Sequence, residues 1–336
     1  MNGVSGPIDR LVLILGGGGF LGQKLAQKLV INKSITVNGH AGPITAIQLV
    51  DRFWPEHRIA DPLIEYTQGD ITDEAILSKT LGRKPDVIFH LAAIVSGEAE
   101  KNFDLGMQVN LHANLRLLEM IRTFNHHPVV VFASTCAAFG PIDKKATDQY
   151  ITDYTAPEPQ SSYGTQKVMM ELLINDYTRK GYLDGRVLRL PTIVVRPGKP
   201  NAATSSFVSS IIREPLQRQR ANCPVSDDVY VWILSPRAVT HNFIHAASLT
   251  SDQLGRKRII NLPGNTVQIK DMVRALDDIA DRPASHLIDW KPDAFIQSIV
   301  LTWPPFFLTS WADELGFMKD ESIHTIISAF AEDELK

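Results

Sequence analysis

The chain has 336 residues, of which 44% are hydrophobic and 21% charged, and its formal net charge is −3. This ordinary globular balance gives no basic field that would favour nucleic acid, and no apolar run approaches the ~20 residues of a membrane helix. Two cysteines are too few for a disulfide framework, and the start of the chain lacks the order of a signal peptide, so we expect a cytoplasmic protein. The histidines show no spacing typical of a metal site, and we expect no bound metal.

Strands and helices alternate through the first half of the chain. Helical periodicity follows Phe20 and Asn110, and continuous apolar runs, typical of strands buried on both faces, begin at Leu11, Thr45, Asp86 and Pro128. This alternation predicts an α/β fold with a doubly wound parallel sheet of the Rossmann type.

Four consecutive glycines follow the first strand and precede the first helix. Gly16, Gly19 and Gly22 form G-x-x-G-x-x-G, a pattern that permits a tight turn and close approach of a pyrophosphate to the helix N-terminus. Asp51 ends the next strand, where a carboxylate can bind both ribose hydroxyls and repel a 2′-phosphate, which favours NAD over NADP. The distance from Gly16 to Asp51 exceeds the usual ~20 residues, and we interpret residues 32–43 as an inserted polar loop.

The regular alternation of predicted strands and helices ends in the second half of the chain. A further strand is predicted from Gly185, and the Pro-, Gly- and Ser-rich stretch 196–206 reads as a long functional loop. We expect an NAD-binding Rossmann domain over residues 1–195. Residues 196–336 would form mainly a small substrate-binding region, with part of the chain returning to the Rossmann domain.

Tyr163 and Lys167 open a predicted helix four residues apart, so they share one helical face. An ammonium close to a phenol favours the phenolate, which can act as general base toward an alcohol. Thr135 lies at the end of the preceding strand and can hydrogen-bond the reacting oxygen. Asn110 is a further polar candidate, either for holding a proton-relay water or for a structural role in its helix.

Together these motifs resemble the extended short-chain dehydrogenase/reductases, also called the NAD-dependent epimerase/dehydratase family. The resemblance also rests on GDITD from Gly69 and HLAA from His90, and it covers most of the chain. It implies bound NAD, Tyr163 as base, Lys167 as its partner and ribose ligand, and Thr135 as second hydroxyl. The implied cofactor contacts, besides Tyr163 and Lys167, are Gly16, Gly19, Phe20, Leu21, Gly22, Asp51, Asp70, Ile71, Leu91, Ala92, Ala93, Pro191 and Ile193. It further implies a homodimer formed through the helices that follow Asn110 and Tyr163.

The second half carries the signals for the substrate. Nucleotide-sugar members of the family hold the diphosphate with an arginine at a position where this chain has Asp228, whose carboxylate would repel it. Residues 189–216 and 232–239 instead resemble members that oxidise the C2 hydroxyl of a small sugar acid with NAD. Such an acid needs one fixed cation and several short polar partners. Arg196, Lys199 and Arg237 offer the charge, with Arg237 favoured because an arginine grips a carboxylate bidentately. The polar candidates are Ser96, Thr135, Thr192, Asn201 and Ser205.

Two other functions stay open from the sequence alone. A sugar or nucleotide-sugar epimerase would recycle its NAD and produce no net NADH. A non-catalytic NAD sensor of the same fold is the other alternative, although such sensors often lack the Tyr–Lys pair that this chain has.

Overall fold

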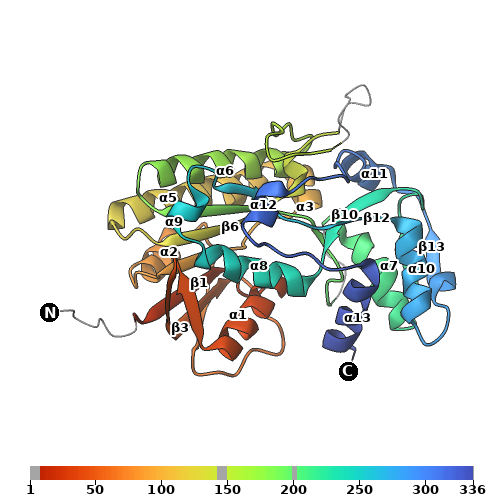
Figure 1. Cartoon of the computed structure of the whole chain (residues 1–336), viewed down its shortest axis with the longest axis horizontal. Coiled ribbons are helices and arrows are strands. Elements are labelled where there is room, and N and C mark those ends of the chain that lie inside the picture. The colour runs from red at the N-terminus through yellow and green to blue at the C-terminus, as the bar shows by residue number, and fades with distance from the viewer. Residues whose placement is uncertain (1–7, 142–149, 199–202, 336) are drawn as a thin grey trace.

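A twisted, mostly parallel sheet forms the centre of the molecule in the computed structural model, which describes residues 8–141, 150–198 and 203–335 (Figure 1). Its strands are, in spatial order, β11 (Ile259–Asn261), β7 (Asp184–Leu190), β6 (Val129–Thr135), β5 (Val87–His90), β1 (Arg10–Leu15), β3 (His40–Asp51) and β2 (Ser34–Val37). Strand β4 (Ile64–Gln68) also pairs with β3. All of these pairings are parallel except that of β2 with β3.

Strand β1 marks the point where the order of the strands reverses. Its neighbours are β3 on one side, where Ile14 lies opposite Leu49, and β5 on the other, where Ile14 lies opposite Phe89. The chain builds outward from β1 in both directions. In open parallel sheets, ligands bind beyond the carboxyl ends of the strands at such a point.

Residues 32–43 form a hairpin, so the prediction of an inserted polar loop was wrong. Strand β2 pairs antiparallel with the first part of β3, and Val37 lies opposite His40. Asn38 and Gly39 connect them with φ of 47° and 79°. An Asn-Gly pair with positive φ at both positions gives the two-residue hairpin turn whose twist matches the strands. The Asn-Gly dipeptide was the signal that could have predicted this hairpin.

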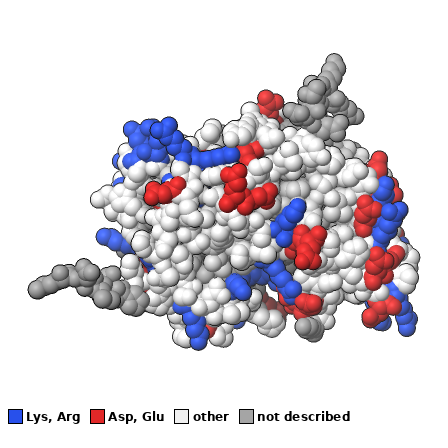
Figure 2. Space-filling model, in the orientation of Figure 1, with Lys and Arg blue, Asp and Glu red and all other residues white. Residues whose placement is uncertain are grey.

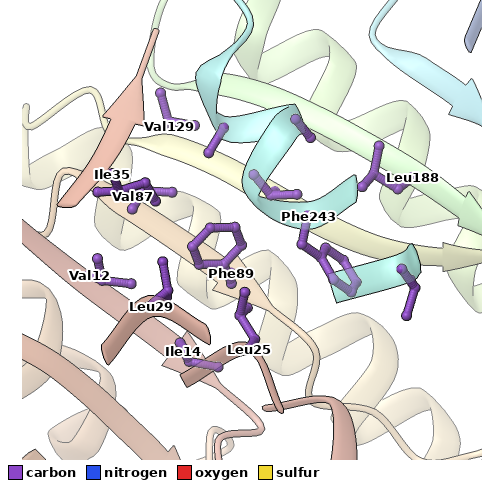
Figure 3. Close-up of a cluster of buried hydrophobic side chains, with 14 of the residues drawn as sticks. Val12, Ile14, Leu25, Leu29, Ile35, Val87, Phe89, Val129, Leu188 and Phe243 are labelled. Carbon is purple, nitrogen blue, oxygen red and sulfur yellow. The ribbon is translucent and has the colours of Figure 1, made fainter. Parts of the chain in front are cut away.

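Two helical layers cover the sheet (Figure 1). Helices α1 (Phe20–Asn32) and α8 (Pro236–Ser248) pack on one face, where Leu25, Phe89 and Phe243 belong to one buried cluster (Figure 3). The other face is covered by α2 (Glu74–Leu81), α5 (Ala113–Phe124) and α6 (Ser162–Arg179). Three short helices and a π-helical turn near the sheet's carboxyl edge complete this region: α3 (Ser96–Lys101), α4 (Phe103–Gly106), η1 (Met107–His112) and η2 (Cys136–Ala138).

A second hydrophobic core lies beyond the carboxyl edge of the sheet. Its strands are β8 (Thr192–Ile193), β10 (Tyr230–Leu234) and β12 (Asn265–Gln268) in one small sheet, and β9 (Ala221–Cys223) and β13 (Ile288–Trp290) in another. Its main helices are α7 (Ser206–Leu216), α10 (Ile269–Ile279), α11 (Ala294–Val300) and α13 (Ile323–Glu334). The remaining elements are α9 (Ser251–Leu254), η3 (Ser285–Leu287) and α12 (Ser310–Glu314). The chain from β8 onward thus supplies this core, and it also supplies α8 and β11 to the central layers.

The surface carries charges of both signs. Figure 2 shows Lys, Arg, Asp and Glu in small groups separated by uncharged side chains on the face drawn there. None of the described helices combines the length and the apolarity needed to cross a membrane.

Candidate active site

A cavity of about 420 Å³ opens at the carboxyl edge of the central sheet, at the reversal of strand order. Its wall comes from the ends of β1, β3, β5 and β6, the start of α6, and the chain around β8. The second core closes its far end through Arg196, Ala203, Ser205 and Trp303. The cavity therefore extends from the glycine turn after β1 to residues of the second core.

The glycine turn brings backbone close to backbone at one end of this cavity. Gly16 has φ of +88°, and a Cβ there would lie 2.7 Å from the Ala92 nitrogen. A Cβ on Gly22 would lie 2.3 Å from the Gly16 carbonyl oxygen, so only glycine lets α1 start this close to β1. Gly19 is different, because a Cβ there would meet no protein atom nearer than 3.4 Å, and the residue lines the cavity. Gly19 is also the N-cap of α1 and offers no capping side chain, so the first N–H groups of the helix are available to an anion such as a pyrophosphate.

Asp51 lies at the end of β3 and faces the same end of the cavity. Its carboxylate accepts hydrogen bonds from the backbone nitrogens of Gly18 at 2.9 Å and Phe53 at 3.2 Å. Neighbouring Arg52 is ion-paired with Asp70 at 3.3 Å. The turn thus fixes one acidic side chain at this end of the cavity, and a Cβ on Gly18 would collide with the Phe53 carbonyl oxygen at 2.0 Å.

Helix α6 positions Tyr163 and Lys167. Its N-cap is Ser161, whose hydroxyl accepts from the Gly164 nitrogen at 3.2 Å. A Cβ on Gly164 would lie 2.2 Å from the Ala137 carbonyl oxygen, so this glycine lets the helix start directly against the end of β6. Thr135 sits at that strand end, where its hydroxyl accepts from the Ala137 nitrogen at 3.1 Å. Glycine at position 164 therefore brings Tyr163 and Thr135 to the same wall of the cavity.

The electrostatics of the tyrosine differ from the expectation. Burial raises the pKa of Tyr163 to about 12, and the charge that lowers it is that of Arg196 rather than Lys167. The Lys167 ammonium donates to the Ala133 carbonyl oxygen at 2.9 Å and lies 5.7 Å from the centroid of the Tyr163 ring. Burial lowers the pKa of Lys167 to about 7, which makes its charge state responsive near neutral pH.

Arg196 lies at the end of the cavity where Tyr163 is found. Its Nε donates to the Ile193 carbonyl oxygen at 3.0 Å, and its Nη2 donates to the Ser205 hydroxyl at 3.1 Å. Nη1 makes no hydrogen bond within the part of the chain that the structure describes. Burial lowers the pKa of Arg196 to about 10, so the guanidinium stays charged at neutral pH. This arginine is a fixed cation next to the candidate base.

Three hydroxyl-bearing candidates also line the cavity: Ser96, Thr192 and Ser205. The Ser96 hydroxyl is 3.0 Å from that of Thr204, which ties α3 to the chain before α7. The predicted cofactor contacts all line the same cavity, namely Gly16, Gly19, Phe20, Leu21, Gly22, Asp51, Asp70, Ile71, Leu91, Ala92, Ala93, Pro191 and Ile193, together with Tyr163 and Lys167. Asn201 and Lys199 lie outside the described residues.

Asn110 does not line the cavity. The prediction that its side chain could hold a proton-relay water is therefore corrected. The residue is fully buried in the π-helical turn η1. Its Oδ1 accepts from the Ile94 nitrogen at 2.8 Å, while its Nδ2 donates to the Ile94 carbonyl and to Gln166 Oε1. The amide is used up in joining the chain after β5 to α6, a structural role.

Arg237 is also outside the cavity wall, which corrects the preference for it as carboxylate ligand. It lies on the first turn of α8, with a side chain that is 48% exposed. Its guanidinium donates to Asp333 at 2.6 and 3.0 Å and to Glu332 at 2.9 Å. These two carboxylates of α13 already accept from the guanidinium N–H groups that a substrate carboxylate would need.

Sequence reasoning missed Trp303, which is the one described residue beyond Ser205 that lines the cavity. It follows α11 and packs against the second core, which contains Val195 beside Arg196. Its indole nitrogen is buried and has no hydrogen-bond partner among the described residues. Nothing in the sequence around it marks it as a site residue, because only the fold of the second core carries it to the cavity.

Residues 12–236 match the model of the NAD dependent epimerase/dehydratase family. The chain is 44% identical over 322 residues to the D-erythronate dehydrogenase of Cupriavidus necator, with 96% of this chain and 98% of that protein covered. It is 42% identical to the D-erythronate dehydrogenase of Haemophilus influenzae, with 96% and 98% covered. The fold is similar to a crystal structure titled as a nucleoside-diphosphate-sugar epimerase from Agrobacterium tumefaciens, with a TM-score of 0.89, 38% identity, and 100% of this chain and 98% of that chain covered.

A holo structure of GalE-like L-threonine dehydrogenase from Cupriavidus necator has a TM-score of 0.83 at 21% identity, with 97% of this chain and 99% of that chain covered, a likeness of fold. The family match spans more than half of the chain, and it includes the glycine turn, Asp51 and the Tyr163–Lys167 helix. The open space and free N–H groups at Gly19 fit a pyrophosphate, and the carboxylate of Asp51 fits a ribose diol. Both groups are parts of NAD, the cofactor in the family's name. The chain therefore belongs to the NAD-dependent epimerase/dehydratase family, the extended short-chain dehydrogenase/reductases, and its cofactor is NAD.

Proposed function

We propose that the protein is an NAD-dependent dehydrogenase that oxidises the C2 hydroxyl of a small sugar acid, D-erythronate, to 2-dehydro-D-erythronate. The observation that carries this proposal is the presence of Arg196 and Tyr163 at the same end of one cavity, close enough for the arginine's charge to lower the tyrosine's pKa. In a 2-hydroxy acid the carboxylate is one bond from the reacting carbon, so its cation must lie beside the base. The two relatives named D-erythronate dehydrogenase, at 44% and 42% identity, support the choice of acid.

The residues for the cofactor divide along the cavity. The N–H groups at the start of α1 would bind the pyrophosphate, and Asp51 would bind the adenosine ribose, where its charge disfavours a 2′-phosphate. Lys167 and the chain at Pro191 and Ile193 would hold the nicotinamide half. Bound NAD supplies the acceptor for the hydride that leaves C2.

The side chains of the protein act on the proton of the C2 hydroxyl, which must leave when the hydride does. The Tyr163 phenolate takes the proton of the C2 hydroxyl as the hydride leaves C2, so the alcohol loses both and becomes a ketone. Thr135 donates a hydrogen bond to the same oxygen, and Arg196 holds the neighbouring carboxylate through Nη1. Because burial raises the pKa of Tyr163, the positive charge of Arg196 is needed to make the phenolate accessible.

The remaining polar groups would bind the other hydroxyls of the acid. Ser96, Thr192 and Ser205 line the cavity with their hydroxyl groups, and Trp303 adds an aromatic wall from the second core. Asn201, predicted from the sequence alone, remains a further candidate for binding a hydroxyl of the acid. We keep residues 1–195 as the cofactor domain in this proposal and the chain beyond 195 as the main source of substrate contacts.

A sugar epimerase is the second candidate, because the crystal structure titled as a nucleoside-diphosphate-sugar epimerase is 38% identical to this chain. The two functions predict different products. A dehydrogenase releases NADH with each turnover, whereas an epimerase returns the hydride and accumulates none. An NAD sensor would show neither reaction.

The proposed assembly is a cytoplasmic homodimer. Helices α5 and α6 expose apolar side chains on the outer face of the sheet's helical layer: Leu115 is 37% exposed, Met169 40% and Leu172 60%. Burial of such a stripe against a second copy would stabilise a dimer.

The test is NADH formation, followed at 340 nm, over a panel of four- and five-carbon sugar acids with NAD, including D-erythronate and L-erythronate. The proposal expects D-erythronate to give the highest kcat/KM. A UDP-sugar that is epimerised without net NADH, in the absence of turnover of any acid, would overturn it.

A further inference from the structure

Helix α6 carries a third ionisable side chain on the face of Tyr163 and Lys167. Glu171 follows Lys167 by four residues, so the two side chains lie on the same side of the helix. Both residues are only 1% exposed. A carboxylate and an ammonium buried this deeply are each costly in isolation, which makes their proximity significant.

Glu171 is fixed in place by two neighbouring strands. From β7, Arg189 donates through Nε at 3.0 and 3.1 Å and through Nη2 at 2.5 Å, a bidentate ion pair. From β6, the Ser134 hydroxyl donates to Glu171 Oε1. Arg189 is itself buried and lies 4.6 Å from the centroid of the Phe139 ring. The carboxylate is therefore fixed on the face of α6 that also carries Lys167.

The other groups around Lys167 supply no negative charge. His90 on β5 is neutral, because burial and the lysine's own charge lower its pKa to about 3. Burial keeps Cys136 a thiol by raising its pKa to about 12. The phenol of Tyr163 is neutral in the absence of ligands, because burial raises its pKa. Among the described groups that face Lys167, Glu171 is the carboxylate that raises its pKa against the effect of burial.

We propose that Glu171 is a positioning residue that keeps Lys167 protonated beside Tyr163, and that Arg189 and Ser134 hold Glu171 for this purpose. The inference deepens the proposed dehydrogenase function and rests on it, because in that proposal Lys167 holds the nicotinamide half of the cofactor and a protonated lysine would donate to its ribose. Glu171 itself touches neither the cavity nor the reacting atoms.

The test compares Glu171→Gln with the double variant Glu171→Gln/Arg189→Met in two titrations. One follows kcat/KM for D-erythronate against pH at saturating NAD, and the other follows NADH affinity by fluorescence against pH without any acid. Glu171→Gln removes the counter-charge and leaves Arg189 unbalanced, and both changes lower the pKa of Lys167. The pH at which Lys167 loses its proton should fall by about one unit or more in both titrations.

The double variant removes both charges, so its midpoint should lie between those of the wild type and Glu171→Gln. Replacing a buried ion pair by neutral side chains is often tolerated, which keeps this variant usable if Glu171→Gln does not fold. Ser134→Ala is the comparison without a change of charge, because it removes one hydrogen bond to Glu171 while Arg189 still holds the carboxylate, and it should move the midpoints much less than Glu171→Gln does.

Equal loss of activity at every pH, with unmoved midpoints and a lower Tm, would show that Glu171 is structural and overturn the proposal. So would a double variant whose midpoint lies below that of Glu171→Gln. If the wild type does not oxidise D-erythronate, the dehydrogenase proposal fails by that result alone, and the NADH titration still decides the role of Glu171.

Discussion

Arg196 should be the residue that binds the substrate carboxylate. Two of its five N–H groups are used on Ile193 and Ser205, and the Nη1 side remains for a ligand in the cavity. A hydrogen bond to a charged group contributes about 1.5–3 kcal/mol. Since 1.4 kcal/mol is a factor of ten, Arg196→Ala should raise KM for D-erythronate about 10- to 100-fold. Arg196→Lys should also be costly, because a point charge replaces a planar fork.

The same variant should change the pH profile. Arg196 is the charge that lowers the pKa of Tyr163. Its removal lets that pKa rise, so less phenolate is present at any given pH. The acidic limb of kcat/KM should therefore move to higher pH in Arg196→Ala, while KM for NAD changes little.

Arg237→Ala is the matched control. It deletes an arginine whose partners are Asp333 and Glu332 on α13, outside the cavity. It should leave KM for the acid within about two-fold of the wild type, because pairs of this exposure contribute only ~0–1 kcal/mol, and that to stability. The reasoning is refuted if steady-state assays show the reverse pattern, with KM raised by Arg237→Ala and unchanged by Arg196→Ala.

Three further predictions concern the base, the cofactor and the assembly. Tyr163→Phe keeps the ring against Lys167 but removes the proton acceptor, so kcat should fall about 10²-fold or more while NADH binding, measured by fluorescence, stays intact; normal turnover would eliminate the mechanism. Asp51→Ala should shrink the preference for NAD over NADP in kcat/KM, whereas Arg52→Ala, whose side chain pairs with Asp70, should not weaken it; an unchanged ratio in Asp51→Ala would contradict the assignment. Leu172→Glu on α6 should dissociate the dimer in sedimentation experiments, while Ile31→Glu, 72% exposed on α1 across the sheet, should not; a wild-type monomer at micromolar concentration would argue against the dimer.

The sequence by itself determined the central sheet and most of the residues that line the cavity. Continuous apolar runs predicted β1, β3, β5, β6 and β7, and the alternation with helices predicted their parallel order. Such signals are local, because a strand buried on both faces needs apolar side chains at every position. The glycine turn, Asp51 and the Tyr163–Lys167 spacing are equally local, since each depends on a few residues next to one strand end. These are the parts of the cavity wall that the sequence placed correctly.

The tertiary structure decided which cation reaches the cavity and which charges act on the base. Arg196 and Arg237 are both arginines next to a proline, so the sequence alone does not separate them. Arg237 on α8 is ion-paired with α13 outside the cavity, whereas Arg196 follows β8 and lines the cavity. Trp303 reaches the cavity wall through contacts between segments that lie far apart in the chain, and Glu171 meets Arg189 through the packing of α6 on β7. Such contacts leave no periodic trace in the sequence, because they depend on how two cores pack together rather than on the conformation of any one segment.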